Sequence, residues 1–414
     1  MKTPLPLAAI LMFALVEPSF AFDTTSPLPN PIPKKQEDFY WDAYRQIGTC
    51  MSQRQPEYPK SALSGLKLLD KSAIMSSKWS HVFPDGSELK ACRTGASGKK
   101  LKPMLRLAIP KLYKDQGQSK NTVEVDTAIS WFSSHSTKAR YEGDGVAREL
   151  LKETLLSWAD ANAIRSYRSN IPNAVDFKFL TLVGAIMNAT SEIAPDLSDE
   201  ERKRLTPWLA RLAGLVGSAR FQYRQDNKSY HAAEIVLVWS IMVGDDKTTQ
   251  SVIDVYKQAI SDMRPDGSFP IDSSRGGMGI TYQAHSTSHL VMIAAILKKS
   301  KGVDLFKYTI DGRSIQDAVG FVVASIKEPG VTNSKYAVSC PNAGDYWGSV
   351  SGPSIYFVKD RAAFLTVYDA VSGDKSFHEW TRQRFWTMTH NAQMSEINGG
   401  APACLMAVKP MKSP

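Results

Sequence analysis

The feature that most constrains this chain is the spacing of its apolar residues, which recur every three or four positions from about residue 122 onward. This spacing lines apolar side chains along one face of a helix, so it predicts a succession of amphipathic helices. Several stretches begin with residues that cap helix N-termini, among them Ser198 and Asp245. Helices are expected at 123–140, 146–167, 174–193, 199–223 (which Pro207 could interrupt), 230–243, 247–263, 279–299, 314–326 and 357–371.

Similar helices joined by short loops are typical of antiparallel helical hairpins, although no sequence repeat is visible. So many helices cannot all pack in a four-helix bundle, whereas a curved array of hairpins can bury every apolar face. We therefore expect an all-α fold, an incomplete (α/α) toroid or barrel with a central groove. Strand-like alternation is scarce before the C-terminal quarter, where 335–350 could hold a hairpin, so the fold can include minor β structure near the C-terminus.

The composition indicates a large core, because 43% of the 414 residues are hydrophobic and only 22% are charged. Intrinsic disorder is therefore excluded as the main state. The length allows several ordinary domains or one large one, and no linker is evident. We expect a signal peptide at 1–21, an N-terminal extension with a basic, lid-like segment at 22–121, and a helical toroid at 122–414.

The first 21 residues have the pattern of a secretory signal: Lys2, an apolar run over 5–16, and small residues that place cleavage after Ala21. This run is too short to cross a bilayer, and no later uninterrupted apolar stretch reaches about 18 residues. We expect no membrane insertion and a periplasmic or secreted protein.

Four cysteines, Cys50, Cys92, Cys340 and Cys404, lack any C-x-x-C spacing. In an oxidising compartment they indicate two disulfides rather than a zinc site. Loop length alone favours pairing Cys50 with Cys92 and Cys340 with Cys404.

The net charge of +9 is concentrated in one segment, since residues 90–120 contain nine basic residues and only Asp115 as an acidic one. Exported proteins do not normally meet nucleic acid, so an anionic glycan or a membrane surface is the partner that such a patch would suit. A solvated basic loop explains the same charges equally well.

Cofactor motifs are missing. Residues 95–100 have the wrong glycine spacing for a phosphate loop, and neither H-E-x-x-H nor G-x-S-x-G occurs. His285 and His289 could share a helical face as a metal pair, but no carboxylate accompanies them at a familiar spacing. We expect no metal and no cofactor.

A polar stripe distinguishes the helix expected from Gly279 onward, because Tyr282, His285, Ser286 and His289 would share the face that normally turns to the core. A satisfied hydrogen-bond network is the structural explanation of such a face. Upstream, residues 226–233 read D-N-K-S-Y-H-A-A and gather an amide, a lysine and a histidine at a helix start.

These residues resemble the alginate lyase family, helical polysaccharide lyases acting on poly-mannuronate and related polyuronates, in which an Asn-His pair opens a helix as N-N-H-S-Y-W-A-A. In that family an arginine follows the proline of a G-F-L-P segment by five residues, and a tyrosine follows the arginine by seven. Pro270, Arg275 and Tyr282 reproduce both spacings, and Asn227 precedes Tyr282 by 55 positions, as in the family. The resemblance extends over about residues 120–300.

The resemblance implies β-elimination on an α/α toroid without a metal. This reaction removes a weakly acidic proton next to a uronate carboxylate, so cationic and amide donors must hold the carboxylate and stabilise the enolate-like intermediate. Arg275 offers a bidentate fork, Asn227 an amide, and Lys228 or His231 further positive charge. The resemblance assigns Tyr282 the roles of base and acid, which nearby cations favour by lowering a phenol pKa.

One departure matters, because the family histidine is Lys228 here and His231 stands at a family tryptophan position. Either Lys228 neutralises the carboxylate, or His231 reaches the same space, or catalysis is impaired.

Four further residues are candidates for substrate binding. His285 belongs to the polar stripe, and Trp131 could be a sugar platform, although tryptophan at helical spacing is more often core. The family has a lid lysine within S-K-Y, for which Lys78 and Lys71 are the local candidates, and a plain surface lysine explains either equally.

Our main hypothesis is an exported, monomeric lyase that cleaves an anionic, uronate-containing polysaccharide (alginate, poly-mannuronate or a glucuronan-like polymer) and leaves an unsaturated uronate end. The alternative is a noncatalytic glycan-binding or export-assisting protein on the same scaffold. A glycoside hydrolase would need two facing carboxylates, for which Asp226, Asp266 and Asp272 are the nearby candidates.

Overall fold

The structure is a computed structural model of the chain. It describes residues 79–84, 111–114, 120–169, 172–217, 226–273, 279–327, 361–383, 395 and 397–408.

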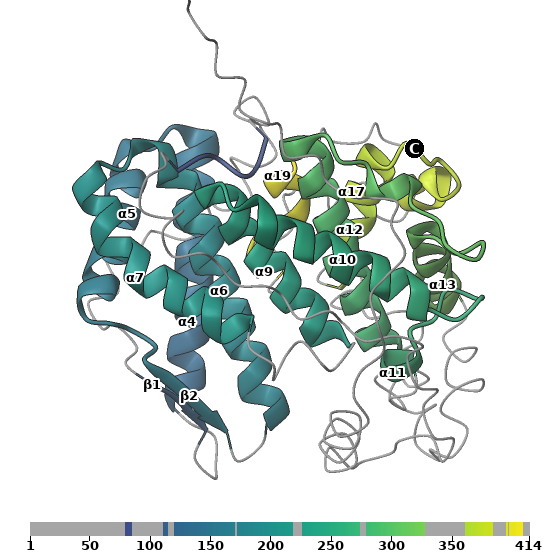
Figure 1. The fold of residues 1–414 in the computed structure, drawn as a ribbon, viewed down its shortest axis with the longest axis horizontal. Coiled ribbons are helices and arrows are strands. Elements are labelled where there is room, and N and C mark those ends of the chain that lie inside the picture. The colour runs from purple at the N-terminus through teal and green to yellow at the C-terminus, as the bar shows by residue number, and fades with distance from the viewer. Residues whose placement is uncertain are drawn as a thin grey trace, which may run out of the picture.

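The described helices form two layers of a curved array (Figure 1). The inner layer contains helices that pack on one another in chain order: α4 (Lys120–Thr137), α6 (Pro172–Ile193), α9 (Asn227–Val243), α12 (Gly279–Lys301) and α17 (Phe364–Val371). The outer layer contains the helices between them: α5 (Gly145–Asp160), α7 (Asp199–Val216), α10 (Asp246–Asp262) and α13 (Ile315–Lys327). This alternation is that of an α/α toroid, so the predicted fold class is confirmed.

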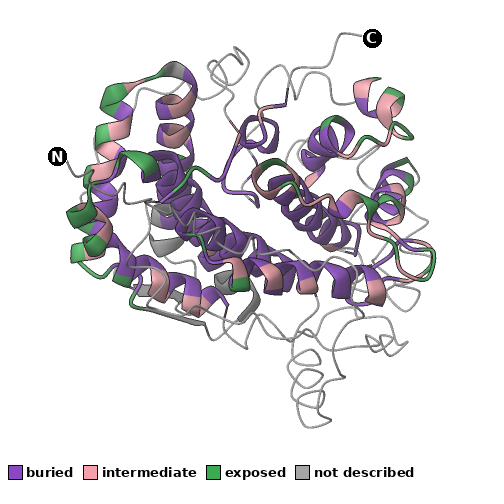
Figure 2. Cartoon of the chain, turned by 45° about the horizontal axis from the view of Figure 1, so that its top comes forward, coloured by how far each residue is buried: buried purple, intermediate pink, exposed green. Residues whose placement is uncertain are grey.

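Burial follows the layers (Figure 2). Every residue of α9 is buried, whereas α5 and α7 expose one face to solvent. A helix that is apolar nearly all round belongs in the interior, because it has no polar face to present to water. The central position of α9 is therefore a consequence of its sequence.

Capping residues fix where several helices begin. Ser198 and Glu201 form a capping box at the start of α7, and Asp144 accepts hydrogen bonds from two backbone N–H groups of α5. Pro207 lies inside α7 without ending it, so the break expected there is absent. The predicted helix at 146–167 was too long, because α5 ends at Asp160 and a turn follows.

Short elements complete the described chain. These are η1 (Lys138–Glu142, a π-helix), η2 (Ala194–Asp196), α11 (Pro270–Ser273), η4 (Leu305–Lys307), α19 (Pro402–Leu405), β1 (Lys111–Lys114) and β2 (Ser166–Ser169).

The two described strands were not predicted. Strands β1 and β2 pair in parallel, with Lys111 opposite Ser166. Each strand has only four residues, too few for an alternating pattern to stand out, and β2 falls where helical spacing was expected to continue. Near the C-terminus the described residues contain one isolated bridge, between Ser395 and Gly400, and the predicted hairpin at 335–350 lies outside them.

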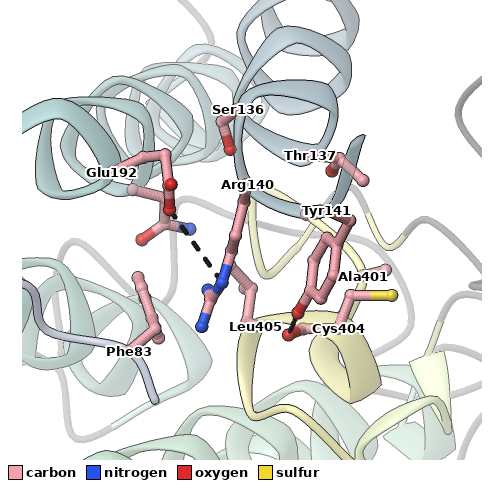
Figure 3. A pocket seen from close by; sticks show the side chains of 11 residues that line it. Phe83, Ser136, Thr137, Arg140, Tyr141, Glu192, Ala401, Cys404 and Leu405 are labelled. Carbon is pink, nitrogen blue, oxygen red and sulfur yellow. Dashed lines mark hydrogen bonds and ion pairs between the residues drawn. The ribbon is translucent and has the colours of Figure 1, made fainter. Parts of the chain in front are cut away.

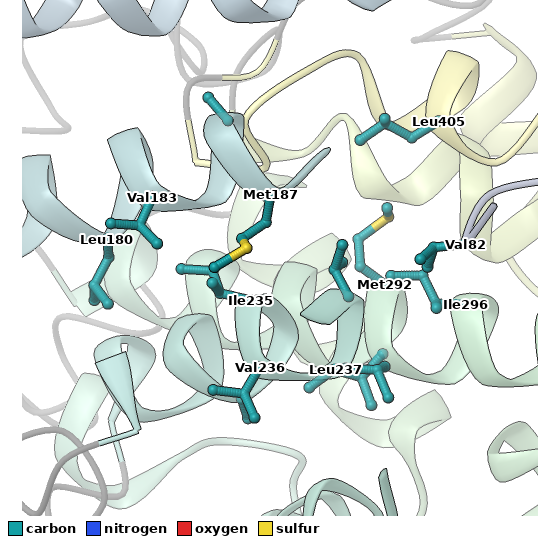
Figure 4. Close-up of a cluster of buried hydrophobic side chains, with 14 of the residues drawn as sticks. Val82, Leu180, Val183, Met187, Ile235, Val236, Leu237, Met292, Ile296 and Leu405 are labelled. Carbon is teal, nitrogen blue, oxygen red and sulfur yellow. The ribbon is translucent and has the colours of Figure 1, made fainter. Parts of the chain in front are cut away.

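The C-terminal segment, residues 397–408, inserts among the inner helices. Ser133 on α4 donates a hydrogen bond to the Gly399 carbonyl at 2.9 Å, and Asn188 on α6 donates to the Asn398 carbonyl at 3.0 Å. Leu405 belongs to the same hydrophobic core as Met187 and Met292 (Figure 4). The end of the chain is thus packed into the toroid.

Several predictions fall outside the described residues, namely the signal peptide, most of the extension at 22–121, and three of the four cysteines. Cys404 is disulfide-bonded, but the predicted pairings stay predictions. No helix among the described residues is long and apolar enough to span a bilayer.

Candidate active site

The start of α9 is fixed by two buried aspartates. Asp226 is the N-cap, and its side chain accepts hydrogen bonds from the backbone N–H groups of Lys228 and Ser229. Asp272, from α11, accepts from the backbone N–H of Asn227 at 3.4 Å and from the hydroxyl of Ser286 on α12. Because one carboxylate contacts both helices, the first residue of α9 is held against α12.

The predicted amide and tyrosine are brought together by a histidine. The Asn227 amide lies 3.4 Å from Nδ1 of His285, and the rings of His285 and Tyr282 meet edge to face with centroids 6.1 Å apart. Asn227 is 2% exposed, whereas Tyr282 is the one residue of 279–297 that is not buried. Tyr282 is therefore the most solvent-exposed member of this group.

One helical turn deeper, a second pair joins the same two helices. The imidazoles of His231 and His289 are stacked 4.2 Å apart, with 12° between their planes. Nδ1 of His289 is hydrogen-bonded to Oε2 of Glu234 at 2.7 Å. The polar stripe predicted on α12 thus faces a matching stripe on α9.

Burial controls the charges of this deeper pair. It lowers the pKa of His231 well below the ordinary value, and the neighbouring His289 adds to the effect. Burial, together with the charge of Arg361, lowers the pKa of His289 to about 3. Burial also raises the pKa of Glu234 well above its ordinary value. Both shifts act toward the neutral forms of the two groups, so burial disfavours an ion pair between His289 and Glu234.

Three residues near the site were missed by the sequence reasoning. The Phe177 ring of α6 stacks on His285 at 5.9 Å, and the Arg361 guanidinium lies 5.6 Å from the centroid of Phe177. Neither residue belongs to a motif, and only the fold brings them close. Glu234 was also missed, although its position three residues after His231 placed it on the same helical face.

The remaining predicted residues are placed as follows. Lys228 is 3% exposed and follows Asn227 directly on α9. Trp131, on α4, is 6% exposed and stacks on His135 of the same helix with ring centroids 3.8 Å apart, so it belongs to the hydrophobic core. Its role as a sugar platform stays a prediction. Arg275, Lys71 and Lys78 lie outside the described residues.

The carboxylates considered for glycoside hydrolysis are occupied by structural contacts. Asp226 and Asp272 are fully buried and hold the start of α9. Asp266 accepts from the backbone N–H and the hydroxyl of Ser268 in the turn before α11. Within the described part of the chain, no three His, Cys, Asp or Glu side chains are arranged to hold a metal ion.

A separate small pocket lies beside the C-terminal segment (Figure 3). It is lined by groups that include Arg140, Glu192 and Leu405, and Nε of Arg140 lies 3.9 Å from Oε2 of Glu192. The Tyr141 hydroxyl donates to the carbonyl of Cys404. The free space inside is about that of one water molecule, so we assign it no ligand.

Comparisons with known proteins show which family and fold the chain is similar to. A family model described as "Alginate lyase" matches residues 83–331. A polysaccharide lyase from Stenotrophomonas maltophilia is 25% identical over 268 residues, which cover 64% of this chain and 78% of that protein.

Solved structures share the fold. Alginate lyase A1-III from Sphingomonas species A1 is 19% identical, with a TM-score of 0.56 over 82% of this chain and 93% of that chain. A tyrosine-to-phenylalanine variant of alginate lyase A1-III, complexed with a tetrasaccharide, is 19% identical, with a TM-score of 0.53 over 84% of this chain and 92% of that one.

Proposed function

Because the chain belongs to the alginate lyase family and is a polysaccharide lyase, we propose that it cleaves a uronate-containing polysaccharide by β-elimination and leaves an unsaturated uronate at the new end. The observation that carries the assignment of residues is the meeting of Asn227 and Tyr282 on either side of His285. These two residues are 55 positions apart, and they carry the amide and the phenol that the reaction needs.

The reaction begins with the uronate carboxylate. The amide of Asn227, the guanidinium of Arg275 and the ammonium of Lys228 neutralise it, so the proton on the adjacent carbon becomes more acidic. Tyr282 removes that proton. As the carbon–carbon double bond forms, the bond from the sugar to the leaving oxygen breaks, and Tyr282 returns its proton to that oxygen. Atoms and electrons balance without an oxidant or reductant.

The protonation state of His231 decides whether Lys228 or His231 takes the role of the family histidine. Burial holds the pKa of His231 well below its ordinary value, so its imidazole is neutral near pH 7 and supplies no positive charge. We therefore assign the neutralising role to Lys228, and to His231 a hydrogen bond to the bound sugar.

The substrate is an alginate, poly-mannuronate or glucuronan-like polymer. Support for alginate comes from the family and from the tetrasaccharide complex of the related alginate lyase. The nine basic residues within 90–120 would attract such a polyanion. We also propose that the protein acts as a monomer in the periplasm or outside the cell, after removal of the signal peptide.

A panel of purified polymers tests this function. Protein is incubated with poly-mannuronate, poly-guluronate, glucuronan and hyaluronan, and the products are analysed by mass spectrometry. β-Elimination yields oligosaccharides lighter by one water than hydrolysis products of the same length, and we expect them from one polymer. Hydrolysis products would overturn the mechanism, and binding without any product would favour the noncatalytic alternative.

A further inference from the structure

The polar contacts of the site continue into the core beyond the residues that the family motif contains. Glu234, His289 and Asn398 form, with His231, a buried group that we call the polar column. We infer that Glu234, His289 and Asn398 are positioning residues that hold the His231 imidazole beside Asn227 for the lyase reaction. This inference rests on the proposed function, and it adds a C-terminal residue to the site.

The geometry of α9 and α12 explains why the polar column reaches the site. His231 and Glu234 follow Asn227 by four and seven residues, so the three side chains share one face of α9. His289 follows His285 by four residues on α12. Since Asn227 contacts His285 while Glu234 contacts His289, the two helices run in the same direction there. The contact of His289 with α9 therefore lies about one helical turn farther along α12 than the contact of His285 with Asn227.

His231 is held by its ring face while its nitrogens stay available. It is 3% exposed, and its one recorded ring contact is the stack on His289. Among the described residues, none forms a hydrogen bond with its imidazole. Gly184 on α6 lies next to the ring, since a Cβ there would make an ordinary van der Waals contact, at 3.6 Å, with Nε2 of His231. The plane of the ring is thus fixed by His289, and its nitrogens can bond a sugar hydroxyl or carboxylate.

His289 is fixed in turn by Glu234, which is 5% exposed. A buried carboxyl group is costly unless it is paired, so the presence of Glu234 on a fully buried helix calls for a reason. Glu234 fixes the ring plane of His289, and the stacked His289 ring in turn fixes the ring plane of His231, which explains why the carboxyl group is there.

Asn398 completes the polar column from the C-terminal segment. Its Oδ1 accepts hydrogen bonds from the hydroxyls of Ser288 and Ser395, both at 3.2 Å, and its amide favours the ionised form of Glu234. The amide oxygen is already used, and the buried amide nitrogen, which has no hydrogen-bond partner in the described part of the chain, is the atom of Asn398 that can donate to a carboxylate. Residues near the end of the chain are therefore part of the support for the site.

A double-mutant cycle tests the inference. Glu234→Gln keeps the size of the side chain but changes its hydrogen bonding, and we expect kcat to fall about tenfold to a hundredfold while KM stays within about twofold. If Glu234 acts through His231, Glu234→Gln in a His231→Gln background causes no further loss. Equal losses in both backgrounds, or an unchanged kcat in the single variant, would overturn the inference.

The control is a second buried carboxylate paired with a histidine. On α17, Asp369 lies 2.9 Å from Nδ1 of His378, and Asp369→Asn is expected to leave kcat unchanged. Thermal unfolding of all the variants checks that they are folded.

An activity-independent measurement separates failure of the inference from failure of the proposed function. The ring signals of His231, assigned by NMR from the His231→Gln variant, are compared between the parent and Asn398→Ala. A changed His231 signal supports positioning through the polar column even if no polymer is cleaved. An unchanged signal overturns the inference even if the parent is an active lyase.

Discussion

The Asn227, His231 and Glu234 side chains lie on one face of a helix whose residues are all buried. Polar groups in such a place destabilise a fold unless each finds a partner. Here Asn227 meets His285, His231 stacks on His289, and Glu234 bonds that same histidine. At the residue scale, the site is thus built from buried polar groups, of which Asn227 and Glu234 have hydrogen-bond partners while His231 is held by its ring stack.

The buried His289 makes stability depend on pH. Burial lowers its pKa to about 3, so between pH 6.5 and 3 the unfolded chain binds a proton that the folded chain does not. The free energy of unfolding therefore falls as the pH is lowered from 6.5, by about 2 kcal/mol at pH 5.

Urea unfolding at pH 7 and pH 5 measures this effect. Glu234 titrates with the opposite sign, because its pKa is raised, so the comparison is made in a Glu234→Gln background. Adding His289→Gln to that background should remove about 2 kcal/mol of the pH dependence. The same pH dependence with and without His289 would show that its imidazole is not held neutral.

Lys228 is the residue at which the chain departs from its family, and two substitutions separate its charge from its shape. Lys228→Met removes the charge that we assign to carboxylate neutralisation, so kcat/KM should fall by about a hundredfold. Lys228→His restores the family residue and should retain more activity than Lys228→Met. Steady-state kinetics on the cleaved polymer decide this, and equal activity of the parent and Lys228→Met would remove Lys228 from the mechanism.

The residue scale also shows what sequence could and could not predict. Asn227 and Tyr282 were predictable because their motifs have fixed spacing, and His285 because it shares a helical face with Tyr282. Arg361 and Asn398 were not, because each comes from a distant part of the chain that only the tertiary fold brings near.

At the scale of elements, helical periodicity predicted the helices better than their ends. The expected helix at 279–299 is α12, and that at 174–193 is α6. The end of α5 was missed because Asn162 and Ile164 adopt positive φ values, of 48° and 55°, and a β-branched residue gives no sequence signal for that conformation.

Packing of the C-terminal segment depends on one glycine. Gly399 has a φ of 60°, and a Cβ there would lie 2.8 Å from the backbone nitrogen of Ala185 on α6. Gly399→Ala therefore combines backbone strain with a clash against a helix backbone, which cannot easily move. We expect the free energy of unfolding to fall by about 3 kcal/mol.

A second glycine provides the control. Gly373 also has a positive φ, of 87°, but a Cβ there would meet nothing within 4 Å. Gly373→Ala should therefore cost only the backbone strain, about 1 kcal/mol. If both variants lost the same stability in urea unfolding, the close approach of Gly399 to α6 would not matter.

At the scale of the whole molecule, the toroid brings together residues from α9, α12 and the C-terminal segment around one site. Its charge adds long-range attraction for a polyanion, since the net charge is +9 and its excess lies within 90–120.

This attraction predicts a salt dependence. Raising the ionic strength from 0.05 to 0.5 M should increase KM several-fold with little change in kcat. Salt screens the long-range attraction between the basic segment and the polyanion, which weakens binding but leaves the chemical step unchanged. Replacing Lys99, Lys100 and Lys102 together by Gln should reduce this dependence. A salt dependence unaffected by these substitutions would mean that the basic segment is only solvated.

Ultraviolet absorbance of the unsaturated uronate product shows whether Tyr282 carries out β-elimination. Parent protein and Tyr282→Phe are mixed with each polymer of the panel while the absorbance is followed. We expect a rise with one polymer for the parent and a loss of at least about a thousandfold in rate for the variant, with binding retained. A variant that cleaves as fast as the parent would show that Tyr282 is neither the base nor the acid of the reaction.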